Sequence, residues 1–86
     1  MRVDLYLKLM GVTKTRMAAK RLCDKGMIRV NQEIVKPSRE IVPGDSLEVL
    51  LPQKETRMKV LQIPARKSVS KKERLEFMAI ESVREL

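Results

Sequence analysis

A chain of 86 residues with 43% hydrophobic and 35% charged residues is expected to fold as one small domain, which excludes wholesale disorder and an elaborate multi-part active site. Its net charge of +8 favours polyanionic partners such as nucleic acid or an anionic membrane surface. The single Cys23 and the absence of histidine exclude an intramolecular disulfide and leave metal or acid–base catalysis almost no ligands, so we expect no enzyme activity, metal or cofactor.

Residues 4–10 are predicted to form a short helix. Its apolar positions are Leu5, Leu7, Leu9 and Met10. Asp4 can cap the start of this helix, and Gly11 can take the left-handed conformation that ends it. The carboxylate of Asp4 can also orient a neighbouring arginine.

A second helix is predicted from a cap at Thr13 or Thr15 to Lys25, with Gly26 as its stop. The residues on its apolar side are Thr15, Ala18, Ala19, Leu22 and Cys23. Basic side chains bracket this stripe, with Lys14, Arg21 and Lys25 on one flank and Arg16 and Lys20 on the other. Because Cys23 lies on the apolar side, we expect a packed thiol and not a reactive one.

After Gly26 the spacing of apolar residues changes from about 3.6 to about 2, which predicts strands. The predicted features are a strand through Ile28 and Val30, a tight turn at Asn31–Gln32, a strand at Ile34–Val35, a turn at Pro43-Gly44-Asp45, a strand from Leu47 to Leu51, and a last strand over residues 57–63. The expected fold class is α+β, with two short helices packed on a small antiparallel sheet.

The rest of the chain is predicted to be a basic connector and an amphipathic helix. We place a boundary between a domain of residues 1–63 and this segment of residues 64–86. Ser70 and Glu73 form the S-x-x-E pattern that opens a helix. Its shared apolar face comprises Leu75, Met78, Ala79, Val83 and Leu86. Whether the helix packs on the sheet or docks on a partner stays open.

Positive charge is concentrated in the first third of the chain. Residues 1–30 hold eight basic and two acidic side chains, residues 31–65 hold five of each, and residues 66–86 hold six and four. This distribution indicates a binding face for a polyanion. With one Phe and one Tyr, the chain lacks the aromatic platforms on which single-stranded RNA stacks. We therefore expect recognition of double-stranded or junction RNA through phosphates and shape, in preference to DNA.

The start of the chain gives no indication of export. Asp4 stands where a signal peptide would have its basic region, and no apolar run approaches the roughly 18 residues of a membrane span. We therefore expect a cytoplasmic location, no membrane partner, and a monomer when the protein is free.

Several short segments follow one another over about the first 50 residues. They are Arg2-Val3-Asp4 with Leu7, Thr15-Arg16-Met17-Ala18-Ala19 with Leu22, Gly26, Ile28-Arg29-Val30-Asn31, Val35-Lys36-Pro37-Ser38 and Gly44-Asp45. In this combination the chain resembles the S4 domain family of RNA-binding modules. Three positions depart from the family's usual residues, namely Leu5, Met17 and Gln32, the last of which replaces a glycine.

The resemblance implies an S4-like fold in which RNA is held by the second helix, the loop before it and nearby strand residues. By position it assigns RNA binding to Arg2, Lys14, Thr15, Arg16, Lys20, Arg21, Asn31 and Lys36. The charge pattern adds Lys25, and Asp4 beside Arg2, to these candidate RNA-binding residues. A catalytic domain, which many S4 proteins carry, has no room here.

The segment Ser70-Lys71-Lys72-Glu73-Arg74 before Phe77-Met78 resembles the C-terminal part of small ribosome quality control proteins of this family, whose relatives include a heat-shock S4 protein. The resemblance implies a non-enzymatic factor that binds large-subunit ribosomal RNA and peptidyl-tRNA in the rescue of stalled translation, with quality control proteins as further partners. Two alternatives stay open: an S4 protein for another structured RNA or for ribosome assembly, and a protein-interaction adaptor that uses the C-terminal helix.

Overall fold

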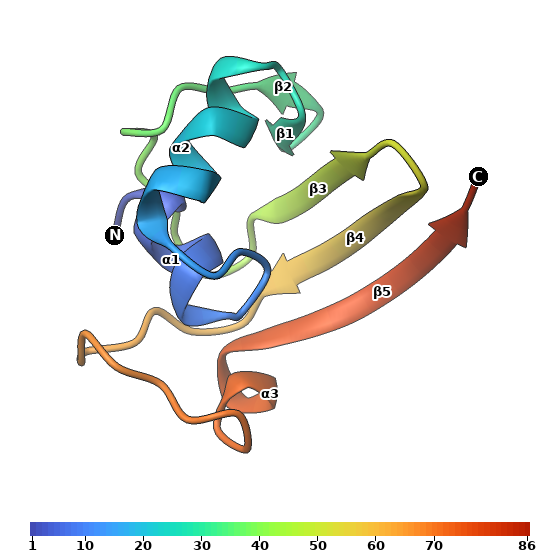
Figure 1. Ribbon diagram of the computed structural model, residues 1–86. Helices are drawn as coiled ribbons and strands as arrows, with labels where there is room; N and C mark the ends of the chain where they lie inside the picture. Colours follow the sequence, from blue (N-terminus) through green and yellow to red (C-terminus); the bar gives the residue numbers. More distant parts are fainter.

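Two helices lie on one face of a five-stranded antiparallel sheet in the computed structural model, which describes residues 1–86 (Figure 1). In chain order the elements are α1 (Val3–Leu9), α2 (Arg16–Asp24), β1 (Ile28–Val30), β2 (Glu33–Ile34), β3 (Ser46–Leu51), β4 (Lys54–Val60), α3 (Arg74–Phe77) and β5 (Met78–Glu85). The strand order across the sheet is β2-β1-β3-β4-β5. The predicted α+β class is confirmed.

The ends of α2 and the stop of α1 lie where the sequence predicts them. Of the two candidate caps, Thr15 is the one used, and its Oγ1 accepts a hydrogen bond from the backbone N–H of Ala18 at 3.1 Å. Gly11 and Gly26 follow the two helices with φ of 74° and 73°, a conformation that costs glycine little.

The prediction that Asp4 caps α1 is wrong, because α1 already begins at Val3 and Asp4 lies in its first turn. The backbone N–H of Val3 donates to the carbonyl oxygen of Arg39 at 2.8 Å, and that of Asp4 donates to the carbonyl oxygen of Pro37 at 3.3 Å. The loop of residues 35–40 therefore satisfies the first two amides of α1 in place of a capping side chain.

The turn between β1 and β2 is a two-residue hairpin turn, as predicted. Asn31 and Gln32 both have positive φ, at 50° and 72°, which matches the twist of the two flanking strands. The side chain of Asn31 stabilises this turn through both polar atoms of its amide group. Its amide nitrogen donates to Asp45 Oδ1 at 3.1 Å, and its Oδ1 accepts from the backbone N–H of Ser46 at 3.0 Å.

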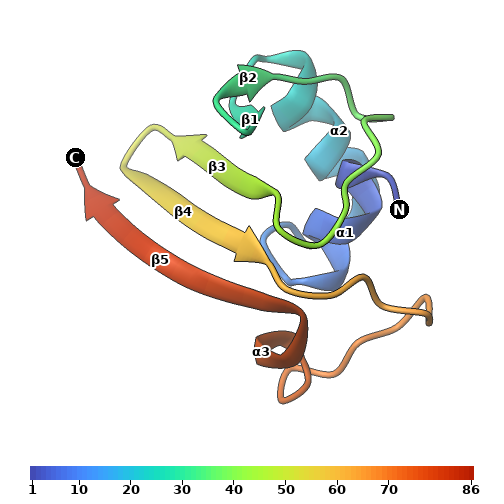
Figure 2. The same ribbon diagram turned by 180° about the vertical axis from the view of Figure 1, so that it is seen from behind.

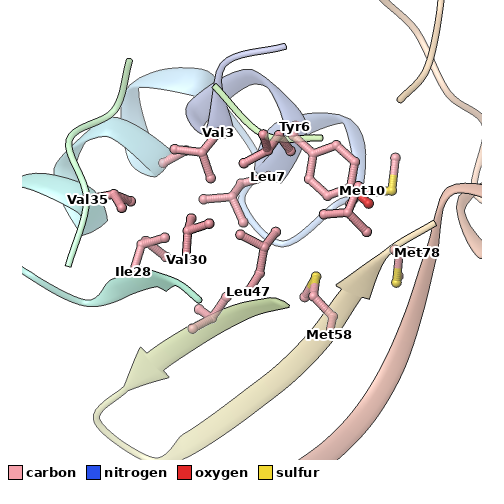
Figure 3. Close-up of a cluster of buried hydrophobic side chains, with 14 of the residues drawn as sticks. Val3, Tyr6, Leu7, Met10, Ile28, Val30, Val35, Leu47, Met58 and Met78 are labelled. Atoms are coloured by element: carbon pink, nitrogen blue, oxygen red, sulfur yellow. The ribbon is translucent and has the colours of Figure 1, made fainter. Parts of the chain in front are cut away.

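The hydrophobic core lies between α1, α2 and the strands β1, β3 and β4, as Figure 3 shows. Tyr6 is fully buried there, and its hydroxyl donates to the carbonyl oxygen of Phe77 at 2.9 Å. Burial raises the pKa of the Tyr6 hydroxyl above its usual range. Since Phe77 ends α3, this hydrogen bond fixes the C-terminal segment against α1.

The prediction of a C-terminal helix over residues 70–86 is wrong for most of that segment. The predicted capping contact does form, since the backbone N–H of Ser70 donates to Glu73 Oε1 at 3.2 Å. Hydrogen bonds from Ser70, and the nearby Arg66, lower the pKa of Glu73. Helix is nevertheless confined to the four residues of α3, and β5 then pairs antiparallel along β4 (Figure 2). The alternative function of a protein-interaction adaptor depends on a C-terminal helix, and the structure has a strand in place of most of that helix.

A β-bulge explains why the apolar residues of β5 do not alternate regularly. Glu81 is an extra residue opposite the step from Arg57 to Met58 in β4. Met78, Ile80 and Val83 consequently line the same groove on the helix side of the sheet, at spacings of two and three residues. Regular alternation, which would have indicated a strand, is lost.

Candidate nucleic-acid interface

A buried carboxylate holds two arginines where the first residues of α1 and α2 meet. Arg2 donates to Asp4 through Nε at 3.2 Å and through Nη2 at 3.1 Å, and Arg16 Nε lies 3.3 Å from Asp4 Oδ2. The Asp4 side chain is 3% exposed, whereas those of Arg2 and Arg16 are 43% and 48% exposed. This Arg2–Asp4–Arg16 cluster therefore presents two guanidinium groups to solvent over one buried acid.

The backbone explains why these three residues meet although Arg16 lies 12 positions after Asp4 in the chain. Arg2 precedes α1 and Arg16 is the first residue of α2, and the two helices pack against each other. Asp4 Oδ1, which accepts Arg2 Nε, also accepts the backbone N–H of Leu5 at 2.8 Å. A carboxylate that is fixed by several donors orients both guanidinium groups. The sequence predicted this role of Asp4 for one neighbouring arginine.

Further cations extend this surface in two directions. Lys20 lies one helical turn after Arg16, on the same flank of α2, and is exposed. Lys36 lies in the loop whose carbonyl groups bond to the start of α1, close in the chain to Pro37. Neither lysine makes an ion pair within the protein. Both are therefore available to an external anion near the Arg2–Asp4–Arg16 cluster.

The residues predicted for the other flank of α2 lie outside this cluster, and Lys14 lies in the loop before the helix. Lys14, Arg21 and Lys25 are exposed and make no internal ion pair. Helical geometry places Arg21 and Lys25 well over 100° around the axis from Arg16. The structure thus brings Arg2, Asp4 and Arg16 together and leaves these three residues outside their cluster.

Two of the predicted site residues use their side chains to stabilise the fold. The hydroxyl of Thr15 accepts the capping hydrogen bond at the start of α2, directly beside Arg16. Asn31 lies in the β1–β2 turn, where both ends of its amide bond to Asp45 and Ser46. The hydrogen bonds within the fold therefore explain the positions of both side chains without an RNA contact.

Cys23 is a packed residue, as predicted. Its thiol is buried beneath α2, and burial, followed by the charges of Asp4 and Asp24, raises its pKa to about 11. It is therefore protonated near neutral pH. No three acidic or cysteine side chains gather where they could hold a metal ion. The helices are all too short or too polar to cross a membrane.

Comparison with known proteins assigns this arrangement to a family. The model of the S4 domain matches residues 1–47, which include α1, α2, β1 and β2. The chain belongs to the S4 domain family. The Arg2–Asp4–Arg16 cluster, built from the first residues of its two helices, lies entirely within the matched part of this S4 protein.

Several relatives that resemble the S4 protein over most of its length are named RQC P-site tRNA stabilizing factor. The one from Helicobacter pylori strain J99 is 32% identical over 79 residues, which cover 92% of this chain and 94% of the relative. Those from Streptococcus pneumoniae and Bacillus subtilis are 38% and 37% identical over 73 residues, which cover 85% of this chain and 80% and 81% of the relatives. The predicted resemblance to ribosome quality control proteins is confirmed.

Solved structures confirm the S4-like fold. The trimeric structure of Vibrio cholerae Heat Shock Protein 15 superposes with a TM-score of 0.86 at 20% identity, over 95% of this chain and 82% of that one. The solution structure of the hypothetical protein HP1423 superposes with a TM-score of 0.84 at 30% identity, over 95% and 98%. Both similarities extend beyond residue 47, so they include the C-terminal segment of the S4 protein.

Sequence reasoning missed three basic residues that the fold brings beside the predicted ones. Arg39 lies in the loop that bonds to the start of α1, and Lys8 lies in the last turn of α1. Arg74, at the start of α3, reaches the α1–α2 loop. The excess of basic residues near the N-terminus could have suggested Lys8, but only the folded chain shows where Arg74 lies.

Proposed function

We propose that this protein binds large ribosomal subunits that carry peptidyl-tRNA and stabilises the tRNA there while stalled translation is rescued. It contacts tRNA and large-subunit ribosomal RNA in the cytoplasm and makes or breaks no covalent bond. The observation that carries the proposal is the Arg2–Asp4–Arg16 cluster, which turns two oriented guanidinium groups to solvent in an S4 domain. The names of the relatives support tRNA as the ligand.

The chemistry of the cluster suits a folded RNA backbone. A guanidinium group can bind a phosphate through two parallel hydrogen bonds, and each arginine is already oriented by Asp4. The first turn of α2, where Arg16 lies, adds the partial positive charge of a helix N-terminus. Lys20 and Lys36 add further charge on either side, so several phosphates can be neutralised at once.

The remaining predicted residues fit this role in different ways. Arg21 and Lys25, on the other flank of α2, and Lys14, in the loop before α2, would contact a second stretch of RNA. Thr15 would hold the turn that presents Arg16. Asn31 could bind RNA through the amide hydrogen that Asp45 does not use, or through the second lone pair of its Oδ1.

Binding alone is sufficient for stabilisation. A factor that binds the tRNA-bearing subunit more tightly than the empty one shifts the equilibrium toward the tRNA-bearing state by its difference in affinity. This mechanism requires no nucleophile or metal. Ribosome quality control proteins that assemble on the same particle are the expected neighbours of the bound protein.

Co-sedimentation with purified large subunits tests the proposal. The protein should bind subunits that carry peptidyl-tRNA more tightly than empty ones, and about four phosphate contacts should lower the affinity about 100-fold between about 50 mM and 200 mM salt. Equal affinity for both particles, or preference for an assembling particle, would instead favour an S4 protein that acts on another structured RNA. An affinity that does not change with salt concentration would contradict recognition through phosphates.

A further inference from the structure

A second basic site lies between the α1–α2 loop and the C-terminal segment. It is a cleft of about 320 Å³, and its lining includes Lys8, Thr13, Lys14, Ser68 and Arg74. Lys8 comes from the last turn of α1 and Arg74 from the first residue of α3. In Figures 1 and 2 the α1–α2 loop and α3 lie at the same end of the molecule. We call this site the Lys8–Lys14–Arg74 cleft.

The charge of the cleft is not balanced by the protein. Three of its lining residues are cations and none is an acid. None of the three makes an ion pair, whereas the arginines Arg2, Arg16, Arg57 and Arg66 each lie against a carboxylate. Glu73, the acid next to Arg74 in the chain, is bound to Arg66 instead. The cleft is therefore a place where like charges gather without a counterion.

Arg74 is partly buried without a partner. Its Nε is shielded from solvent and has no hydrogen-bond acceptor. The guanidinium group lies against Gly11, so closely that a Cβ atom at that position would collide with it. Removing a cation from water without pairing it is unfavourable. An anion in the cleft would supply the missing negative charge.

We propose that the Lys8–Lys14–Arg74 cleft binds a backbone phosphate of RNA. The inference rests on the proposed function, since the cleft would take a second phosphate of the RNA that contacts the Arg2–Asp4–Arg16 cluster. The two sites are joined along the chain, because Lys14 in the cleft is followed by Thr15 and Arg16. Together they bind the backbone at two places on the same pair of helices.

RNA fits the cleft better than an acidic protein segment does. Only two of the eight lining residues are hydrophobic, and the exposed surface of the cleft is mostly polar. Protein partners usually bury an apolar centre, which this cleft lacks. Lysine and arginine with neighbouring hydroxyl groups are the side chains that commonly contact phosphate oxygens.

The inference also gives the C-terminal segment a role. Arg74 is held in place by its neighbours on both sides in the chain. Before it, Glu73 bonds to Ser70 and Arg66, and after it, the carbonyl oxygen of Phe77 accepts a hydrogen bond from the hydroxyl of Tyr6. The pairing of β5 with β4 then holds α3 near the α1–α2 loop. The segment thus supplies a guanidinium group to a site that the two N-terminal helices begin.

The test compares two double variants of equal charge. Lys8→Gln with Arg74→Gln removes two cations of the cleft, and Lys71→Gln with Lys72→Gln removes two exposed lysines that do not line it. The first pair should weaken binding to tRNA-bearing large subunits about tenfold and reduce the slope of log affinity against log salt by about 1. The second pair should change the affinity less than about threefold. The same ranking is expected with protein-free large-subunit RNA and tRNA.

Three outcomes separate the inference from its alternatives. Equal losses in the two double variants would overturn it while leaving the proposed function intact, provided the wild-type protein binds. A loss confined to whole subunits, absent with protein-free RNA, would overturn it in favour of an acidic protein partner. If Arg74→Gln prevents folding, Lys8→Gln alone, at an exposed position, should still weaken binding about threefold, and an unchanged affinity would reject the site.

In solution, inorganic phosphate probes the cleft without any ribosome. The backbone amide resonances of residues 11–14 and 68 should shift with phosphate in the wild-type protein and should not shift in the Lys8→Gln, Arg74→Gln variant. Shifts of equal size in both proteins would contradict a phosphate site at this cleft. A wild-type protein that responds to phosphate but not to large subunits would instead contradict the proposed function.

Discussion

Replacing Arg2 and Arg16 together by alanine is expected to weaken binding to tRNA-bearing large subunits about 100-fold. Each guanidinium group is about half exposed and is oriented by Asp4, so each can form a charge-assisted contact with a phosphate. Two such contacts correspond to about 3 kcal/mol, which is about 100-fold in affinity. Equilibrium co-sedimentation at one fixed salt concentration measures the loss, and the slope against log salt should fall by about 2.

The matched control removes two other arginines. Arg57→Ala with Arg84→Ala gives the same change of charge on strands β4 and β5, and Arg57 is also paired with a carboxylate, Glu48. This pair should leave the affinity within about threefold. Arg2→Lys with Arg16→Lys keeps the charge but not the forked donor geometry of a guanidinium group. The affinity of this variant should therefore lie between those of the alanine variant and the wild type. Equal losses for both alanine pairs would mean that only net charge matters.

Asp4→Asn is expected to weaken binding about tenfold while the protein stays folded. Asparagine keeps the shape of the side chain and an oxygen for the backbone N–H of Leu5. It loses the negative charge that orients Arg2 and Arg16, and its amide would present N–H groups to their guanidinium groups. Asp4 is therefore a positioning residue, and the affinity should fall although no RNA contact is removed directly.

A double-mutant cycle distinguishes this role from a general loss of stability. In the Arg2→Ala, Arg16→Ala background, Asp4→Asn should have almost no further effect on affinity, because the groups that it orients are absent. Thermal unfolding of each variant checks that binding is measured on folded protein. An Asp4→Asn effect of the same size in both backgrounds would show that Asp4 acts on binding without the arginines.

Local features of the first 35 residues could be predicted well from the sequence. Thr15 caps α2, Gly11 and Gly26 follow the helices with positive φ, and Asn31–Gln32 forms the hairpin turn. Each depends on the conformation of one or two residues. The predicted start of α1 is wrong because the first two amides of the helix are satisfied by a loop more than 30 positions away, which the local sequence does not indicate.

The C-terminal segment shows the opposite case. Its apolar residues lose the alternation of a strand because Glu81 forms a bulge, and the hydrogen bonds that make it a strand come from β4. Pairing of this kind depends on tertiary structure and overrides local propensity. For the same reason, the approach of Arg74 to Lys8 could not be predicted, whereas the candidate residues on α2 could be identified from charge and from the S4 resemblance.

Photo-crosslinking from Met17 tests most directly whether this protein binds the tRNA-bearing large subunit through the start of α2. Met17 follows Arg16, is 57% exposed and carries no charge, so a photoreactive residue there leaves the Arg2–Asp4–Arg16 cluster intact. With large subunits that carry peptidyl-tRNA, sequencing of the crosslinked RNA should identify the tRNA or the large-subunit RNA beside it. Crosslinks that are confined to other RNAs, or that are equally frequent on empty subunits, would contradict the proposed function.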